Sequence, residues 1–513
     1  MTDSAVEWDE AAKKKTGKSA NQRRSAMTKV SVFDEAYVLE EFRKRGLKEA
    51  HAFTLWRYLI QHRLSLEELD EVPNVSKKAV QMFQEELTVT SKVLDRQVSA
   101  DKSAVKLLIQ LHDDRKIESV IMRYGAVQLA SFPEELRGQR KEEVRESVDE
   151  DEIGEGQEEE EGECGDDKGS VTTSSKGPRE FKSNRRATVC VSSQVGCQMG
   201  CTFCATGTMG LVANLTAGEI LEQLYHANNV EQIRNVVFMG MGEPLDNYEE
   251  VVGAIRGMTD VRRFQLAASR ISVSTVGVVP KLRKLAHDAP GCSLALSLHA
   301  PTQDLRTSIV PSARAWSLEK ILEASDYFVR IQKSKVKRRG GKPQFVLVEY
   351  VLIADVNDSD ETAHELGKLL AERADSVMLN VIPYNPTDVP HDYKPPSQAR
   401  LNRFLDLVRT HGVRTVVRQE LGQDVAAACG QLVVSREKQQ EGERERPSQQ
   451  PGVVQGAEGS AAGGSDNIVN GLRLDLSPLL RSCADPVTAV SAISISLAAV
   501  CAVAVAYSRW RRK

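Results

Sequence analysis

The stretch Cys197-Gln-Met-Gly-Cys201-Thr-Phe-Cys204 places three thiols at spacings of four and three residues. A loop with this spacing can direct three thiolates to one face of a 4Fe-4S cluster, which leaves the fourth iron without a protein ligand. An iron with an open position indicates chemistry rather than electron storage. A zinc knuckle is the alternative, but a closed zinc site needs four ligands, and neither a second CxxC pair nor an HxxxH segment accompanies the stretch. The spacing therefore favours a cluster.

The residues around this stretch resemble those of a known family. The CxxxCxxC spacing, with Phe203 before the last cysteine, resembles the signature of radical S-adenosylmethionine (SAM) enzymes, in which the open iron binds the amino and carboxylate groups of SAM. The longer segment ATVCVSSQVGCQMGCTFCATG, residues 187–207, is similar to the dual-specificity rRNA and tRNA adenine carbon-2 methyltransferases. The resemblance covers about residues 35–435, apart from an acidic insertion. It implies a radical SAM RNA methyltransferase that uses a 4Fe-4S cluster and SAM.

Length and composition indicate a globular protein of about three domains. The chain has 513 residues, of which 41% are hydrophobic, so it can bury a sizeable core. Its formal charge of -4 is dominated by residues 142–163, which hold thirteen acids and one base. Without that segment the remainder carries a charge of +8, which suits a polyanionic partner such as RNA. Nine cysteines, five of them at motif positions, do not form the pattern of a secreted disulfide framework, so we expect a reducing compartment.

The region before the cysteine motif divides into four segments. Residues 1–33 mix basic and acidic side chains without an apolar run, which predicts a disordered basic tail rather than a targeting peptide. Residues 34–99 have apolar side chains at helical spacing and predict a small helical domain. Residues 100–133 alternate around a turn at Asp113-Asp114 and predict a β-hairpin. Residues 134–184 are acidic and rich in glycine and serine, so we expect a disordered insertion.

From residue 185 to residue 435, expected strands and helices alternate. The strands are expected at 188–191, 235–240, 270–274, 293–298, 344–352 and 376–382. The helices between them include 217–226, 248–258, 318–331, 361–373 and 398–411. This alternation predicts a parallel sheet with right-handed crossovers. Six units predict an α/β fold, a partial (β/α)6 TIM-like barrel with its function at the C-terminal strand ends, and the radical SAM resemblance implies the same fold.

The C-terminal part has two segments of different composition. Residues 436–485 are rich first in Gln, Glu and Arg and then in Gly, Ser and Ala, which predicts a disordered linker. Residues 486–507 carry no charge and precede a tryptophan and a basic cluster that ends at Lys513. Twenty-two uncharged residues can span a bilayer, so 486–513 is a candidate membrane anchor, although its many Ala and Ser residues make a buried or non-native tail an equal alternative. The location, cytoplasmic or organellar, stays open.

Several residues at the C-terminal ends of the expected strands match SAM contacts of the resembled family. Gly242 and Glu243 follow the second strand, where a glycine lets the backbone approach a ligand and a carboxylate can accept from an ammonium group. The resemblance assigns these two residues to the SAM amino group. The other matching positions are Ser274, Ser297, Leu298, His299 and Asn385. A single histidine at a strand end would more often be structural, but matches on several strands favour one common site.

Two further cysteines match the paired catalytic cysteines of the family. Cys190 precedes the cluster loop and Cys429 follows the last strand, although a lone cysteine is more often a small buried side chain. The resemblance implies that one SAM methylates Cys429 and that a radical from a second SAM activates this methyl group for addition to adenine. Cys190 would then form a disulfide with Cys429 and release the product. The family's proton acceptor matches Glu118, which the insertion separates from Cys190.

The resemblance also defines partners and alternatives. A base must leave its stack to reach such a site, which favours a single-stranded or loop region of rRNA, tRNA or both. Trp56-Arg57 and Lys77-Lys78 of the helical domain are candidate RNA contacts, with a plain packing domain as an equal alternative on sequence alone. We also expect a flavodoxin-type electron donor and a monomer. The alternatives are the sister family that methylates carbon 8 with the same cysteine pair, and a non-catalytic RNA-binding or ribosome-assembly protein, against which the intact cysteines argue.

Overall fold

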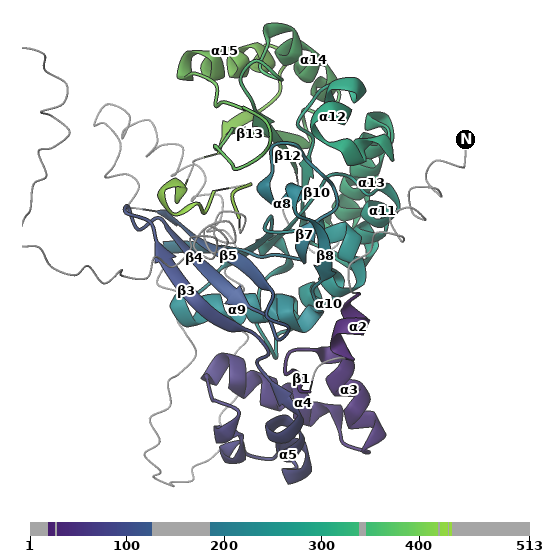
Figure 1. The fold of residues 1–513 in the computed structure, drawn as a ribbon. Coiled ribbons are helices and arrows are strands. Elements are labelled where there is room, and N and C mark those ends of the chain that lie inside the picture. Colours follow the sequence, from purple (N-terminus) through teal and green to yellow (C-terminus); the bar gives the residue numbers. More distant parts are fainter. Residues whose placement is uncertain are drawn as a thin grey trace, which may run out of the picture. The chain divides into compact units, whose positions relative to one another are not determined.

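The computed structural model describes residues 19–25, 28–125, 185–337, 345–418, 421–428 and 430–432 (Figure 1). The expected insertion at 134–184, linker at 436–485 and candidate anchor at 486–513 lie outside these residues, as does Cys429. Among the described residues, no helix combines the length and the apolar character that a bilayer crossing requires.

A ten-stranded sheet forms the centre of the fold, and its parallel part contains the six strands that the sequence predicts. These are β6 (Arg185–Cys190), β9 (Asn235–Phe238), β10 (Ile271–Thr275), β11 (Ser293–Ser297), β12 (Val346–Leu352) and β13 (Val377–Pro383). Each pairs in parallel with the next, from β6 to β13. A short parallel strand, β14 (Thr415–Val417), follows β13. The predicted (β/α)6 partial barrel is therefore confirmed.

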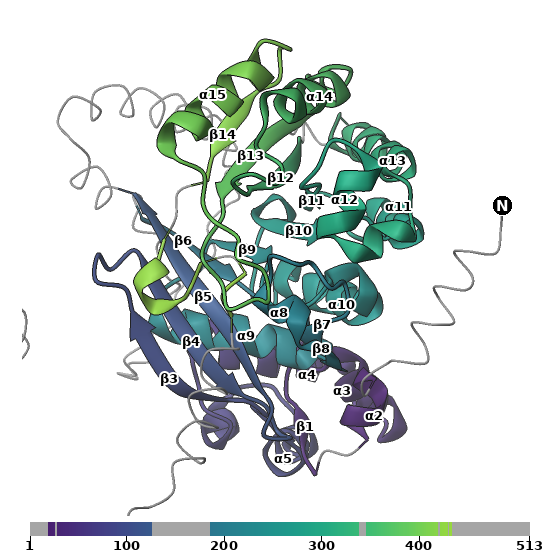
Figure 2. The same ribbon diagram turned by 45° about the horizontal axis from the view of Figure 1, so that its top comes forward.

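The helices that connect these strands lie along the outer side of the sheet (Figure 2). They are α9 (Ala217–Val230), α10 (Tyr248–Thr259), α11 (Val279–Asp288), α12 (Gln303–Ile309), α13 (Leu318–Lys337), α14 (Asp360–Ala371) and α15 (Gln398–Arg409). Polar side chains define several of their first turns. Thr216 and Glu219 form a capping box at the start of α9, while Ser359 and Ser397 cap α14 and α15. The expected helices are thus confirmed, with ends shifted by a few residues.

The predicted hairpin is confirmed as β4 (Ala104–Gln110) and β5 (Lys116–Gly125). Because β5 pairs with β6, the hairpin extends the barrel sheet. The expectation of a helical domain up to residue 99 is wrong in its last part, since β3 (Lys92–Val98) pairs with β4 at the sheet edge. Along β3 the side chains alternate between exposed and half-buried, and such a polar edge strand has no strong hydrophobic period.

The helical domain consists of α3 (Glu35–Lys44), α4 (Glu49–Arg57), a π-helical turn (Tyr58–His62), a 3-10 turn (Glu67–Glu71) and α5 (Lys77–Glu86). Its core contains Phe42, Trp56 and Phe83, whose rings lie about 6 Å apart. Trp56 is fully buried, and its indole Nε1 donates to the carbonyl of Val32 at 2.6 Å. The suggestion that Trp56 contacts RNA is therefore wrong, whereas its neighbour Arg57 is exposed.

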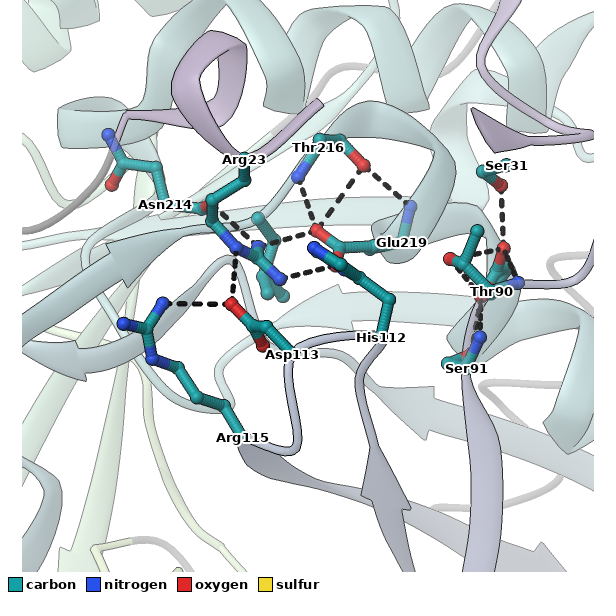
Figure 3. A network of polar contacts seen from close by, with 12 residues as sticks. Arg23, Ser31, Thr90, Ser91, His112, Asp113, Arg115, Asn214, Thr216 and Glu219 are labelled. Atoms are coloured by element: carbon teal, nitrogen blue, oxygen red, sulfur yellow. Dashed lines mark hydrogen bonds and ion pairs between the residues drawn. The ribbon is translucent and has the colours of Figure 1, made fainter. Parts of the chain in front are cut away.

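The expectation of a disordered tail over residues 1–33 is wrong for its described part. Helix α2 (Ala20–Arg24) begins at a capping box on Ser19. Arg23 is fully buried, and its guanidinium donates to both carboxylate oxygens of Glu219 on α9, at 2.5 and 2.6 Å (Figure 3). It also donates to Asp113 in the hairpin turn at 3.2 Å. An ion pair instead of an apolar run anchors this segment, which explains why hydrophobic patterning does not reveal it.

A second buried carboxylate on α9, that of Glu222, fixes both ends of the helical domain. It accepts hydrogen bonds from the Ser31 hydroxyl at 2.6 Å and from the backbone amides of Thr90 and Ser91 at 2.8 Å. Ser31 precedes the domain, whereas Thr90 and Ser91 follow it (Figure 3). Burial raises the pKa of Glu222, and these hydrogen bonds partly offset the shift. Helix α9 is therefore the attachment point of the helical domain.

We predict that Arg23→Ala lowers the free energy of unfolding by about 3–5 kcal/mol, because it leaves the buried Glu219 carboxylate without its main partner. The matched control is Arg115→Ala, which removes a partly exposed partner of Asp113 and should cost about 0–1 kcal/mol. Urea denaturation of the full-length variants measures both values. Equal and small losses of unfolding free energy in the two variants would show that the pair of Arg23 with Glu219 does not anchor α2.

Candidate active site

The cluster loop runs from the end of β7 (Gln194–Cys197) to the short helix α8 (Ala205–Thr208), and β7 pairs with β8 (Gly210–Asn214). Backbone hydrogen bonds fix the loop between these elements. The amide of Thr202 donates to the carbonyl of Ile309 at 2.9 Å, and that of Cys204 donates to the carbonyl of Cys201 at 3.1 Å. The hydrogen bond to Ile309 holds the loop against the C-terminal end of α12.

Cys197, Cys201 and Cys204 line one cavity at the C-terminal ends of the parallel strands. Its volume is about 160 Å³, whereas an ordered water needs roughly 10–15 Å³. The same wall includes the predicted SAM contacts Gly242, Glu243, Ser274, Ser297, His299 and Asn385. The structure thus gathers all three predicted cluster ligands with all predicted SAM contacts except Leu298, whose side chain is buried in the core.

The electrostatics of the three thiols fit a cationic group. Burial raises the pKa of Cys197 well above its ordinary value and that of Cys201 to about 12, and negative charge on the neighbouring thiols adds to both shifts. Three thiolates in this position therefore require positive charge, which the irons of a cluster provide. Within the described part of the chain, no group of three Cys, His, Asp or Glu residues is arranged to hold a single metal ion. Cluster thiolates instead bind separate irons.

The turn after β9 presents a buried carboxylate to the cavity. Glu243 is almost completely buried; its Oε1 accepts from the amide of Leu245 and its Oε2 from the amide of Val276, both at 2.9 Å. Burial raises the pKa of Glu243 to about 7, and these two bonds counteract part of the shift. Gly242 has a φ of +99°, and a Cβ there would lie 2.6 Å from the Cβ of Gln194. Glycine is therefore required at the turn.

The next strand ends contribute hydroxyl and imidazole groups. The hydroxyl oxygens of Ser274 on β10 and Ser297 on β11 lie 3.3 Å apart. His299 follows β11 with a φ of +63°, and its Nδ1 accepts from the amide of Val351 at 3.1 Å. Burial, together with the charge of Arg306, lowers the pKa of His299 to about 3. The imidazole is therefore neutral, with its proton on Nε2.

A second cavity shares part of its wall with the first, including Cys204 and Asn385. Cys190, at the end of β6, lines this second cavity, as do Ala428 and Gly430. Cys429, the second predicted catalytic cysteine, lies between Ala428 and Gly430 in the sequence and is outside the described residues. Cys190 thus lines the same cavity as Cys204, one of the three predicted cluster ligands.

Glu118 lies in β5, on the second strand of the hairpin as expected, but it lines neither cavity. Its carboxylate is buried and lies 3.5 Å from the Nζ of Lys106. Lys106 also donates to the carbonyl of Ala426 at 3.2 Å. In this arrangement Glu118 supports the C-terminal segment and is not placed at the cavity.

Known proteins resemble this chain over most of its described length. Residues 191–366 match the family model of the radical SAM superfamily. The crystal structure of a radical SAM methyltransferase from Sphaerobacter thermophilus is similar with a TM-score of 0.60 and 30% identity, over 79% of this chain and 99% of that chain. The ribosomal RNA large subunit methyltransferase N of Nitrosopumilus maritimus is 35% identical over 373 residues, which are 71% of this chain and 87% of the relative. The chain belongs to the RlmN family.

A further relative in the RlmN family supports this assignment. The dual-specificity RNA methyltransferase RlmN 1 of Myxococcus xanthus is 43% identical over 258 residues, which are 49% of this chain and 68% of the relative.

In this RlmN-family chain, the cavity also has charged residues that sequence reasoning missed. Glu349 on β12 is buried, and its Oε2 accepts a hydrogen bond from the side-chain Nδ2 of Asn380 at 2.8 Å. The guanidinium of Arg418 lies 3.9 Å from the same oxygen. Glu349 is the one charged residue of an otherwise apolar strand, and this signal could have identified it. Arg418 follows the short edge strand β14, where no sequence pattern distinguishes it.

We predict that Gly242→Ala disrupts the cavity of this RlmN-family chain, because the added methyl group collides with Gln194 in addition to straining the backbone. The matched control is Gly46→Ala, where φ is also positive at +64° but no atom lies within 4 Å of the new Cβ. The control should lose only about 1–2 kcal/mol of stability from backbone strain. Thermal unfolding and SAM binding of the two variants provide the measurement. A Gly242→Ala protein with normal SAM affinity would contradict the proposed packing of the turn.

Proposed function

We propose that this protein methylates carbon 2 of an adenine in RNA, with SAM as the methyl donor and as the radical source. The observation that carries the proposal is that the three-thiol cavity and the Cys190 cavity share a wall at the strand ends. Carbon 2 of adenine is electron-poor and its C–H bond is not acidic, so it offers no nucleophile to an ordinary methyl donor. A carbon radical on a methyl group that a cysteine carries can add to carbon 2 directly, without any nucleophile on the ring. Relatives named as RNA methyltransferases support the substrate class.

In this proposal Cys197, Cys201 and Cys204 hold a 4Fe-4S cluster next to the SAM contacts. A cluster bound by these three thiolates would supply the electron for the reductive cleavage of SAM to a radical. The carboxylate of Glu243 accepts from the SAM ammonium group, and neutral His299 lies at the same edge of the sheet, where it follows β11, two strands away from β9.

Cys429 acts as the carrier of the methyl group. Its thiolate attacks the SAM methyl group, so that a carbon–sulfur bond to Cys429 forms while the bond from the methyl carbon to the sulfonium sulfur breaks and S-adenosylhomocysteine leaves as a neutral thioether. Its neighbours in the sequence, Ala428 and Gly430, line the cavity beside Cys190. The radical formed from SAM takes a hydrogen atom from the S-methyl group, and the resulting methylene carbon bonds to the ring, which then loses its ring proton and one electron that the cluster would take back. The Cys190 thiolate next attacks the Cys429 sulfur, a sulfur–sulfur bond replaces the carbon–sulfur bond, and the released carbon takes up a proton to become the methyl group of the free base. The disulfide is thus a transient of the reaction.

The ring proton needs an acceptor, for which Glu118 is a candidate. Its carboxylate can reach a substrate only if its ion pair with Lys106 opens. Removal of the proton by Cys190 requires no such movement, since this thiol already lines the cavity.

The RNA partner is rRNA, tRNA or both, bound at a region whose target base is easily extruded. Arg57, Lys77 and Lys78 of the helical domain are exposed and can contact phosphates. We further propose a flavodoxin-type protein as the electron donor and a monomer as the active state.

Anaerobically reconstituted wild-type protein, incubated with RNA, SAM and a reductant, should produce 2-methyladenosine, whereas Cys429→Ala should produce none. The matched control is Cys292→Ala, which removes another buried thiol that lines neither cavity and should retain activity. Mass spectrometry of the RNA nucleosides measures the product. 8-Methyladenosine would assign the chain to the carbon-8 chemistry, and methylation by Cys429→Ala would exclude the carrier role.

SAM affinity should fall as the pH is lowered through about 7, because the protonated Glu243 cannot accept from the SAM ammonium group as a carboxylate does. If only the ionised form binds, the affinity at pH 6 is about tenfold lower than at pH 8. Titration calorimetry of the reconstituted protein measures this dependence. Glu243→Gln should bind SAM weakly, and its affinity should not change between pH 8 and pH 6. If the variant shows the same pH dependence as the wild type, another group must be responsible for it.

A further inference from the structure

A small cavity adjoins the cluster loop and is distinct from the two cavities of the reaction. Its wall contains Arg306 on α12, Ser312 in a 3-10 turn (Pro311–Arg314) and Trp316, together with apolar side chains that include Met199 of the cluster loop. Its volume of about 10 Å³ corresponds to one water-sized group, for which roughly 10–15 Å³ is required. Any ligand in it must therefore be of atomic size.

Three polar atoms on this wall are buried and make no hydrogen bond: Arg306 Nη1, Ser312 Oγ and Trp316 Nε1. In the described part of the chain, seven buried side-chain atoms lack a partner, so almost half of them belong to this one cavity. Buried polar groups in proteins are nearly always paired, because an unpaired one loses its hydration without compensation. The three atoms together indicate a ligand that accepts hydrogen bonds.

The remaining nitrogens of Arg306 are occupied. Its Nε donates to the carbonyl of Leu298 at 3.0 Å, and its Nη2 donates to the carbonyls of Val276 at 2.6 Å and Ser297 at 3.2 Å. The guanidinium is fully buried, and its partners in the described residues are neutral carbonyls instead of a carboxylate. The opposite charge that acts on it among the described residues is that of the Cys201 thiolate in the cluster loop. A buried cation that is only partly compensated is costly. Negative charge in the cavity would offset this cost.

The donor set distinguishes an anion from water. Guanidinium and indole N–H groups can only donate, and a serine hydroxyl can donate as well. A water molecule would also need acceptors for its own two hydrogens, and among the side chains of the wall only the Ser312 hydroxyl is a strong acceptor. The small volume favours a monatomic anion over phosphate or sulfate. A monatomic anion satisfies all three donors and the charge of Arg306.

We propose that Arg306, Ser312 and Trp316 bind one monatomic anion of the chloride type. The anion holds the Arg306 side chain in the orientation that ties α12 to the ends of β10 and β11. Those ends include Ser297 and the amide of Val276, which contacts Glu243. The anion therefore stabilises the wall of the larger cavity without taking part in the reaction, and the inference does not depend on the proposed function.

Crystals of the full-length protein grown in sodium bromide test the site directly. We expect an anomalous bromide peak within hydrogen-bond distance of Arg306 Nη1 and Trp316 Nε1. An ordered water without anomalous signal at that position would overturn the proposal.

Thermal unfolding in sodium chloride and in sodium gluconate at equal ionic strength tests the site in solution. The midpoint of the wild type should rise with chloride concentration but not with gluconate, because a ligand that binds only the folded state stabilises it. Trp316→Phe and Ser312→Ala each remove one donor and should reduce this rise. Ser308→Ala is the matched control, since it removes an exposed hydroxyl on α12, the helix that carries Arg306. This variant should retain the rise of the unfolding midpoint with chloride. The same chloride response in all variants, or none in the wild type, would contradict the proposal.

Discussion

Parallel pairing from β6 to β13 is the constraint on which the rest of the structure depends. Parallel strands end at the same edge of a sheet, so residues that follow different strands meet there although they are far apart in the sequence. Ser297, Glu349 and Asn380 show this directly, because they are register partners on three adjacent strands. The cluster loop is tied to the same edge by the bond from Thr202 to Ile309. The fold thereby converts a short cysteine motif into one part of a composite site.

The helical domain is attached to this barrel by buried charges. Besides the pair of Arg23 with Glu219, the guanidinium of Arg263 is fully buried, donates to Glu35 at 2.8 Å and faces the ring of Trp56. Burying such pairs contributes little net stability, but removing one partner is costly, so they favour one docking arrangement over others. Apolar packing contributes as well, since the buried side chains of the domain and the barrel form one cluster in which the Phe33 ring lies 5.3 Å from that of Tyr225 and 5.9 Å from that of Phe264. Buried charges and apolar contacts together therefore fix the position of the domain relative to the site.

Much of the fold and site could be predicted from the sequence, because the relevant patterns are local. Six apolar strands alternate with amphipathic helices, and the cysteine spacing defines the cluster loop without reference to other elements. Contacts that depend on tertiary context escaped prediction. Arg23 has no apolar neighbours to mark it, β3 is a polar edge strand, and Trp56 fills the domain core although its neighbour Arg57 is exposed. The orphaned nitrogen of Arg306 is evident only once its partners are placed.

We propose that Cys190 releases a base that is covalently attached to Cys429. The most direct measurement is denaturing gel electrophoresis of the full-length Cys190→Ala variant after incubation with labelled RNA, SAM and a reductant. Without the Cys190 thiol the carbon–sulfur bond to the base has no thiol to replace it, so we predict a covalent RNA–protein adduct that Cys429→Ala does not form. Normal yields of methylated RNA from Cys190→Ala, with no adduct, would contradict the account.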